Sequence, residues 1–249
     1  MNTKDSKKRI CNLEIHTVKK DIKNIHLGVY PPNGRVRVAA PTKTTDETIK
    51  VLVVSKMPWI KKQQSKFNKQ ERQTKREYVS GESHFFMGNR YLLNVVNTSS
   101  SPKVEIKRKT HIDMYVKPES SPRKREELMD SFYRSELKKQ IPTLIEKWEK
   151  ITGITVKEFR IKKMKTKWGA CSPKYQRVWL NLELAKKPLR CLEYVLVHEM
   201  THLIEKNHTE EFKTLMNSFM KQWNQYKEEL NDSTLGYSKW EYLYEQTDV

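Results

Sequence analysis

Alternating apolar and polar positions dominate the first half of the chain and predict β-strands. Ile25, Leu27 and Val29 alternate with less apolar neighbours, and the same alternation returns over residues 36–40. Residues 31–34, Pro-Pro-Asn-Gly, separate the two runs with turn-forming residues, so we expect a β-hairpin here. Further alternating segments, joined by Gly-Asn or Ser/Thr-rich turns, predict strands over residues 83–86, 90–96, 104–107 and 112–116.

A segment with helical periodicity lies between these strands. The pair Thr45-Asp46 can cap a helix that carries apolar residues at helical spacing as far as Ile60. Pro58 either bends this helix or marks a second start, because proline is accepted only in the first turn. Residues 61–76 are almost wholly polar and basic, which favours a solvated helix face.

The second half of the chain follows mainly a helical period. Ser121-Pro122 opens a long helix with proline at its favoured first position. We expect Pro142 to kink this helix and Gly153 to end it. Beyond it, the pattern predicts two strands and then helices to the end of the chain, with the strands over residues 156–161 and 177–182 and the helices after Pro188.

These patterns predict an α+β fold in two parts. Residues 1–120 are expected to form a small, mostly antiparallel β-sheet region with one helical element, and residues 121–249 a helical core. A chain of 249 residues is long enough for one large domain or two small ones, each with its own core. No internal repeat is evident in the sequence.

The sequence His-Glu-x-x-His occupies residues 198–202 of an apolar helical stretch. Residues four apart lie one turn above each other, so His198 and His202 can present two imidazoles to one metal ion, with Glu199 beside it. Burying these groups without a partner is costly, and a metal ion provides that partner. Bound zinc lowers the pKa of its bound water, and Glu199 is then the catalytic base that accepts the proton.

A catalytic zinc needs a third protein ligand, and His208 follows His202 by six residues. Metzincins have the same spacing, with a glycine midway where the chain leaves the helix; Glu205 stands at that position here. Either the helix breaks later, with Asn207 in the left-handed conformation, or a different turn presents His208.

A different role for His208 stays open at this stage. His208 can instead belong to the N-terminal cap of the next helix, together with Thr209. Neutral imidazole suits zinc, which favours His208 as the ligand. In the alternative, the third ligand is Glu205, Glu210 or Glu211.

The chain resembles the YgjP-like metallopeptidases, which are relatives of the SprT-like zinc proteases. Four segments carry the resemblance, in family order and spacing: residues 165–172 (Lys-Thr-Lys-Trp-Gly-Ala-Cys-Ser), 178–181 (Val-Trp-Leu-Asn), 193–202 (Glu-Tyr-Val leading to the His-Glu-x-x-His motif) and 207–209 (Asn-His-Thr). The resemblance covers most of the chain. It implies a zincin-like helical metallopeptidase core with an active helix, zinc held by His198, His202 and His208, and catalysis by Glu199.

Three aromatic residues and one strand near the motif have alternative roles. In zinc peptidases of this plan an extended peptide pairs with an edge strand over the active helix, and residues 177–182 are our candidate. Trp168 and Trp179 either line the cleft or pack in the core, and we favour the core. Tyr194 either donates to a developing oxyanion or is a buried structural hydroxyl, which we favour.

The chain is strongly basic, with 49 lysines and arginines against 30 acidic residues and a formal net charge of +19. Such a charge attracts polyanions, and residues 61–76 and 123–125 suggest a sequence-independent nucleic-acid contact. The charges are nevertheless spread along the chain, which favours a role in solubility.

Cysteine usage and hydropathy bear on the compartment. The three cysteines, Cys11, Cys171 and Cys191, are odd in number and lack CxxC spacing, which fits a reducing cytoplasm. The first nine residues are polar and lysine-rich, and no later stretch is apolar over the length of a membrane span. We therefore expect a cytoplasmic protein without a membrane segment.

The predicted function is that of a zinc metallopeptidase that hydrolyses peptide or protein substrates with a metal-activated water. The alternative keeps the zinc and makes the chain a protease or accessory factor acting on nucleic-acid-bound proteins. A zinc-stabilised binding module is disfavoured, because structural sites are usually closed by four protein ligands.

Overall fold

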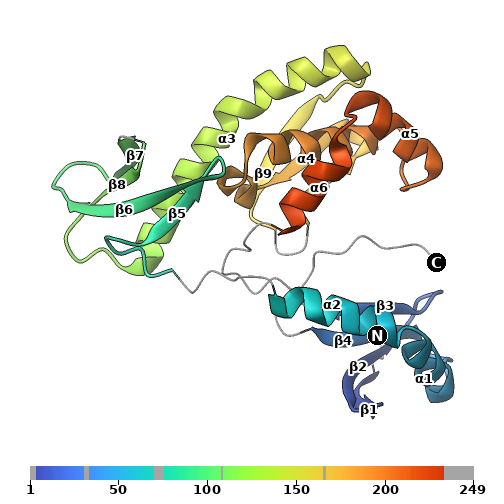
Figure 1. The fold of residues 1–249 in the computed structure, drawn as a ribbon. Helices are drawn as coiled ribbons and strands as arrows, with labels where there is room; N and C mark the ends of the chain where they lie inside the picture. The colour runs from blue at the N-terminus through green and yellow to red at the C-terminus, as the bar shows by residue number, and fades with distance from the viewer. Residues whose placement is uncertain (1–3, 31–33, 70–75, 108, 165–166, 233–249) are drawn as a thin grey trace. The chain divides into compact units, whose positions relative to one another are not determined.

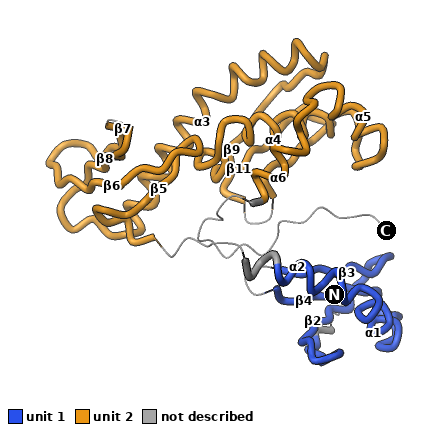
Figure 2. The backbone as a smooth tube through the Cα atoms, in the orientation of Figure 1, with its two compact units in different colours: residues 1–73, 237–249 blue, residues 74–236 orange. Residues whose placement is uncertain are grey.

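The computed structural model describes residues 4–30, 34–69, 76–107, 109–164 and 167–232, and it has a mixed α/β fold (Figure 1). The chain divides into two compact units, one within residues 1–73 and one within residues 74–236 (Figure 2). Each unit has its own hydrophobic core. None of the described helices is both long and apolar enough to cross a bilayer.

The first unit is built on a four-stranded sheet of order β1-β2-β4-β3. β3 and β4 pair antiparallel, which confirms the predicted hairpin; its turn at residues 31–33 lies outside the described residues. β2 and β4 run parallel, and β1 pairs antiparallel with β2. The strands are β1 (Lys4–Ile10), β2 (Leu13–Lys20), β3 (His26–Tyr30) and β4 (Arg35–Pro41).

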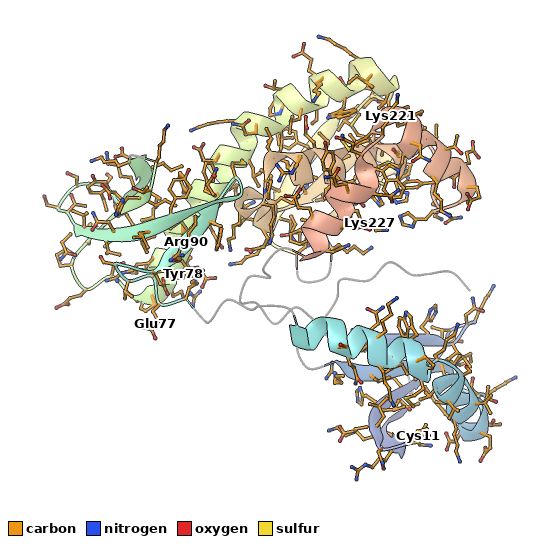
Figure 3. All side chains as sticks on the ribbon, in the orientation of Figure 1. Cys11, Glu77, Tyr78, Arg90, Lys221 and Lys227 are labelled. Atoms are coloured by element: carbon orange, nitrogen blue, oxygen red, sulfur yellow. The ribbon has the colours of Figure 1, made fainter. Side chains whose placement is uncertain are left out.

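The pair β1–β2 was not expected from the pattern. A two-residue turn joins the strands, with Cys11 at φ 48° and Asn12 at φ 63° (Figure 3 labels Cys11). Positive φ at both central residues is the type I′ geometry that matches strand twist. The usual Asn-Gly or Asp-Gly signal is absent and β1 is mostly polar, so neither the turn nor the strand is conspicuous in the sequence.

Two helices cover this sheet, α1 (Asp46–Ser55) and α2 (Met57–Lys69). The Thr45 hydroxyl accepts the backbone N–H of Thr48 at 3.2 Å, which confirms the predicted cap. Pro58 is the second residue of α2 and marks a second helix start. The core between helices and sheet includes Ile15, Val29, Val36, Val38, Ile49, Val53 and Ile60.

The second unit begins with a sheet of order β5-β6-β8-β7, which repeats the pattern of the first. Two antiparallel pairs are joined by a parallel pair between their inner strands, β6 and β8. The sheet confirms all four strands predicted between residues 83 and 116. They are β5 (Ser83–Phe86), β6 (Asn89–Asn97), β7 (Lys103–Lys107) and β8 (His111–Val116).

The long helix α3 (Pro122–Thr152) connects this sheet with the rest of the unit. It starts at the Ser121 cap and ends at Gly153, whose φ of 71° is left-handed, as predicted. The Tyr133 hydroxyl of α3 donates to the carbonyl of Phe85 at 2.9 Å. The second sheet therefore belongs with the helices, and the observed units differ from the predicted division between residues 120 and 121.

A third sheet of order β10-β11-β9 lies next to the C-terminal helices. β11 is its central strand, antiparallel to β10 and parallel to β9. The strands are β9 (Glu158–Lys162), β10 (Gly169–Ser172) and β11 (Arg177–Asn181). The remaining elements are the 3₁₀ turns η1 (Pro173–Tyr175) and η2 (Leu182–Lys186) and the helices α4 (Leu189–Thr201), α5 (Glu210–Phe219) and α6 (Trp223–Asp232).

The central place of β11 corrects one prediction. We expected residues 177–182 to offer an edge to a substrate, but both edges of β11 are already paired. The alternating sequence shows that a strand is half-buried, yet it carries no information about which edges are occupied. The edge strand next to α4 is β10, which the pattern missed because it is only four residues long.

Candidate metal centre

Three imidazole nitrogens converge at the end of α4. The Nε2 atoms of His198 and His202 lie 3.2 Å apart, and each lies 3.1 Å from Nε2 of His208. His198 and His202 face the same way because four residues separate them on one helix. These three form the one group of potential metal ligands found among the described residues.

A turn after α4 carries His208 back to the other two histidines. The helix ends at Thr201, and the backbone N–H of Glu205 still donates to the Thr201 carbonyl at 2.9 Å. Asn207 is not among the residues with positive φ, so the second of the two expected routes is the one observed. Thr209 then caps α5 by accepting the backbone N–H of Phe212 at 3.3 Å.

The Phe212 ring packs against all three histidine rings. It is 1% exposed, and its ring centroid lies 4.5 Å from that of His202, 5.0 Å from that of His198 and 4.9 Å from that of His208. The ring stacks on His202 and meets the other two edge to face. The sequence pattern assigned Phe212 no role at the site, because a single phenylalanine in a helix is typical of an ordinary core residue.

The protonation of His202 and His198 favours a cation between their rings. Nδ1 of His202 lies 2.9 Å from the carbonyl oxygen of Glu205, which only accepts, so Nδ1 carries the proton and Nε2 a lone pair. Burial and the neighbouring histidines lower the pKa of His198 well below its ordinary value, so its ring is neutral.

The three nitrogens fit a metal ion that accepts imidazole, zinc among them. Ligand nitrogens about 2.0–2.1 Å from a tetrahedral zinc lie roughly 3.3 Å from one another. The observed separations of 3.1 and 3.2 Å are close to this value. The hydrogen bond from Nδ1 of His202 to the backbone carbonyl of Glu205 is of the kind that orients metal-bound histidines.

Glu199 lies beside these histidines with its carboxyl buried. It is 7% exposed, and burial raises its pKa to about 8, while the positive charge of Lys167 acts in the opposite direction. Gly169 of β10 faces the carboxyl closely: a Cβ built on Gly169 would lie 2.6 Å from both Cγ and Oε1 of Glu199. The edge strand thus passes directly over this carboxyl.

Asn181 was missed as a candidate, although its side chain binds the backbone of the segment that leads into β10. It is fully buried, and its amide donates to the carbonyls of Met164 (2.9 Å) and Lys167 (2.8 Å). Its side-chain oxygen accepts the backbone N–H groups of Met164 (3.3 Å) and Glu183 (3.2 Å). The only sequence signal was its place in the Val-Trp-Leu-Asn segment.

Two of the acidic residues considered as the third metal ligand in place of His208 make other contacts in the structure. The Glu205 carboxylate accepts the backbone N–H of Asn207 at 3.0 Å, and Glu210 pairs with Lys213 at 2.6 Å.

Tyr194 is 5% exposed and stacks on Trp223 with centroids 6.5 Å apart, which suits a structural role.

In this mixed α/β fold, a helix and the following turn bring three histidines and a glutamate together. The family model described as "YgjP-like, metallopeptidase domain" matches residues 23–233, and the chain belongs to this family. A solved structure, the metallopeptidase zymogen of Pyrococcus abyssi abylysin, is similar at 20% identity and a TM-score of 0.34, over 36% of this chain and 91% of its own. No curated protein matches the chain.

Proposed function

We propose that this chain is a zinc peptidase in which His198, His202 and His208 hold the metal and Glu199 is the general base. The observation that carries the proposal is the convergence of three Nε2 atoms within 3.1–3.2 Å of one another, next to a buried carboxyl. Three histidine ligands leave one tetrahedral position for water or substrate, as catalytic zinc sites require.

The roles of the residues follow from this arrangement. Zinc, when bound, lowers the pKa of a coordinated water to about 7 and polarises a carbonyl oxygen. A positive charge nearby lowers the pKa of a carboxyl. Glu199 in the zinc-bound protein is therefore ionised at neutral pH and ready to accept a proton from the coordinated water. Glu199 then donates that proton to the leaving amine, and its burial keeps bulk water from competing for it.

The substrate is a peptide in extended conformation that pairs with β10. An edge strand offers unpaired backbone groups, and β10 is an edge strand whose Gly169 lies against Glu199. A peptide bound along this edge brings a scissile bond close to the base. β10 thus takes the role that the sequence had suggested for residues 177–182.

The proposal is tested by metal content and turnover on the same variants. In the wild type we expect one zinc per chain by elemental analysis, and cleavage of a library of short peptides followed by mass spectrometry. Glu199→Gln should keep the zinc and lose about a hundredfold to ten-thousandfold in rate, because the amide cannot accept a proton. His208→Ala should lose zinc and turnover together.

A matched control separates the site from histidine loss in general. His26 is exposed on β3 of the first unit, and His26→Ala should keep both zinc and activity. Full zinc occupancy in His208→Ala would remove His208 from the ligand set. Normal turnover in Glu199→Gln would place the base elsewhere.

A further inference from the structure

The face of the third sheet that points away from α4 carries two aromatic side chains, Tyr175 and Trp179, with Arg177 between them. We call these three residues the aromatic ladder. Val178 and Leu180 of β11 are fully buried in the core, so strand alternation turns Arg177 and Trp179 to the opposite face. Trp179 is only partly buried and does not belong to either core, whereas Trp168 packs against the core of the second unit. The favoured core role therefore holds for Trp168 and is wrong for Trp179.

Arg177 stands between two aromatic rings. Its guanidinium carbon lies 5.3 Å from the ring centroid of Tyr175 and 5.3 Å from that of Trp179. Glu158, its cross-strand neighbour on β9, pairs with it and fixes its direction. Tyr175 is 55% exposed, so part of its ring is accessible to solvent although Arg177 and Lys174 lie over it.

Basic side chains surround the ladder. Arg160 is the cross-strand neighbour of Trp179 and Lys162 follows on the same side of β9; both are exposed. Lys174 lies 5.5 Å from the Tyr175 ring centroid. Together with Arg177 these residues place four cations on the face, and the Glu158 carboxylate pairs with two of them, Arg177 and Arg160.

We propose that this face binds single-stranded nucleic acid. Unpaired bases stack on solvent-accessible aromatic rings, here the exposed Tyr175 and the partly buried Trp179, and each base gains about 1–3 kcal/mol in this way. Lys162 and Lys174 are placed to contact the phosphates between them. A duplex hides its base faces, so the rings add nothing to duplex binding.

The basic segments named from the sequence are less suited to this role. Arg123 pairs with Glu127 at 3.1 Å, and Arg125 donates to the Tyr78 carbonyl at 3.2 Å. In the segment 61–76, Lys61 and Lys62 are exposed, and residues 70–75 lie outside the described residues. Neither segment shows exposed rings among its described side chains. The ladder therefore combines charge with stacking surfaces in a way that charge alone does not explain.

The experiment measures the affinity of the full-length protein for fluorescently labelled oligothymidylate, oligouridylate and a DNA duplex by anisotropy at several salt concentrations. Tyr175→Leu with Trp179→Leu removes both rings and no charge. We expect this double variant to bind the single strands at least about 30-fold more weakly, with an unchanged salt slope. Trp179→Phe should restore part of the affinity, since it keeps a ring.

Two controls separate stacking from general attraction by a basic protein. Lys61→Gln with Lys62→Gln removes two exposed charges far along the sequence from the ladder and should change single-strand affinity less than loss of the rings. Polyglutamate, a polyanion without bases, should compete poorly at equal charge concentration. If Trp179→Leu alone lowers the unfolding midpoint, the exposed Tyr175→Leu variant is used instead.

Three results would overturn the proposal. The first is the absence of single-strand binding at low salt. The second is wild-type affinity in the folded ring variants. The third is equal binding of duplex, single strand and polyglutamate, which would show that the surface responds only to negative charge.

Discussion

Gly169 lies against Glu199 so closely that any larger residue at this position would displace the glutamate side chain. A Cβ built on Gly169 would stand 2.6 Å from Cγ and Oε1 and 2.9 Å from Cδ of the glutamate. The backbone of Gly169 has no positive φ, so conformational freedom is not the reason for glycine here. The reason is space: the edge strand and the carboxyl share one small volume.

Gly169→Ala is therefore expected to disable the base and spare the metal. The added methyl group forces the Glu199 side chain into another rotamer, away from the position next to the histidines. We expect a rate loss comparable to that of Glu199→Gln, about a hundredfold or more, with full zinc content. Peptide cleavage and elemental analysis on the same preparation check this.

A second glycine provides the control for that experiment. Gly81 has open space around its Cβ position but a φ of 88°, so Gly81→Ala strains the backbone without touching the site. It should lower the free energy of unfolding by about 1 kcal/mol and leave the specific activity unchanged. Wild-type activity in Gly169→Ala would show that the carboxyl does not work from its observed position.

Asn181→Ala should destabilise the second unit strongly. The change removes the partners that the fully buried amide provides to backbone groups of Met164, Lys167 and Glu183. We expect a loss of about 3 kcal/mol in the free energy of unfolding, measured with urea. Asn94→Ala is the matched control: its amide bonds Asp113 on an exposed surface, so the loss should stay below about 1 kcal/mol.

The buried histidine of the second sheet predicts a pH dependence of stability. His84 is 4% exposed, and burial together with the charge of Arg76 lowers its pKa to about 4 from 6.5, while Glu82 at 3.2 Å acts in the opposite direction. Glu82 is itself held by the backbone N–H groups of Glu77 and Tyr78, each at 2.8 Å (Figure 3 labels both).

Between pH 6.5 and about 4, the unfolded chain binds a proton at His84 that the folded chain does not. Stability is therefore highest above pH 6.5 and falls with acidification, by at most about 1.4 kcal/mol per pH unit from this residue. Urea unfolding at a series of pH values should show a smaller slope in His84→Gln. An identical slope, or an NMR titration of His84 near its ordinary value, would contradict the burial argument.

The two units predict which fragments fold alone. Leu93, Ile112 and Met114 of the second sheet share one core with Leu137 and Ile141 of α3. A fragment of residues 121–249 loses these buried side chains, at about 2 kcal/mol each, which is a large part of a typical domain's stability.

A fragment of residues 76–249 should therefore unfold cooperatively, with native-like circular dichroism. The fragment 121–249 should not. Cooperative unfolding of the shorter fragment would restore the division between residues 120 and 121 that the sequence pattern suggested.

Strong local patterns predicted most of the elements correctly. The alternation over residues 83–116 and the cap, proline and glycine signals of α3 are local, and the structure confirms them. The spacing of His198 and His202 likewise determines that they share a helix face. Their role as ligands, and that of Glu199 as base, stays a prediction.

What the sequence did not predict depends on contacts between distant segments. Nothing local distinguishes the central strand β11 from an edge strand, and only the pairing with β9 and β10 decides it. The place of Trp179 outside the core is also a tertiary property, as is the clamp formed by Asn181. The compact units differ from the predicted division, because strands followed by a helix look the same in the sequence whether or not they share a core.

The common strand order of the first two sheets has a consequence for how quickly each assembles. Every antiparallel pair joins neighbouring strands of the sequence, so both sheets reduce to two hairpins that form within microseconds. The one non-local event in each is the parallel docking of one hairpin on the other, through β2–β4 or β6–β8. That docking step carries the cost of loop-closure entropy, so substitutions along β4 or β8 should slow refolding. Changes in the outer strands β1 and β7 should mainly speed unfolding.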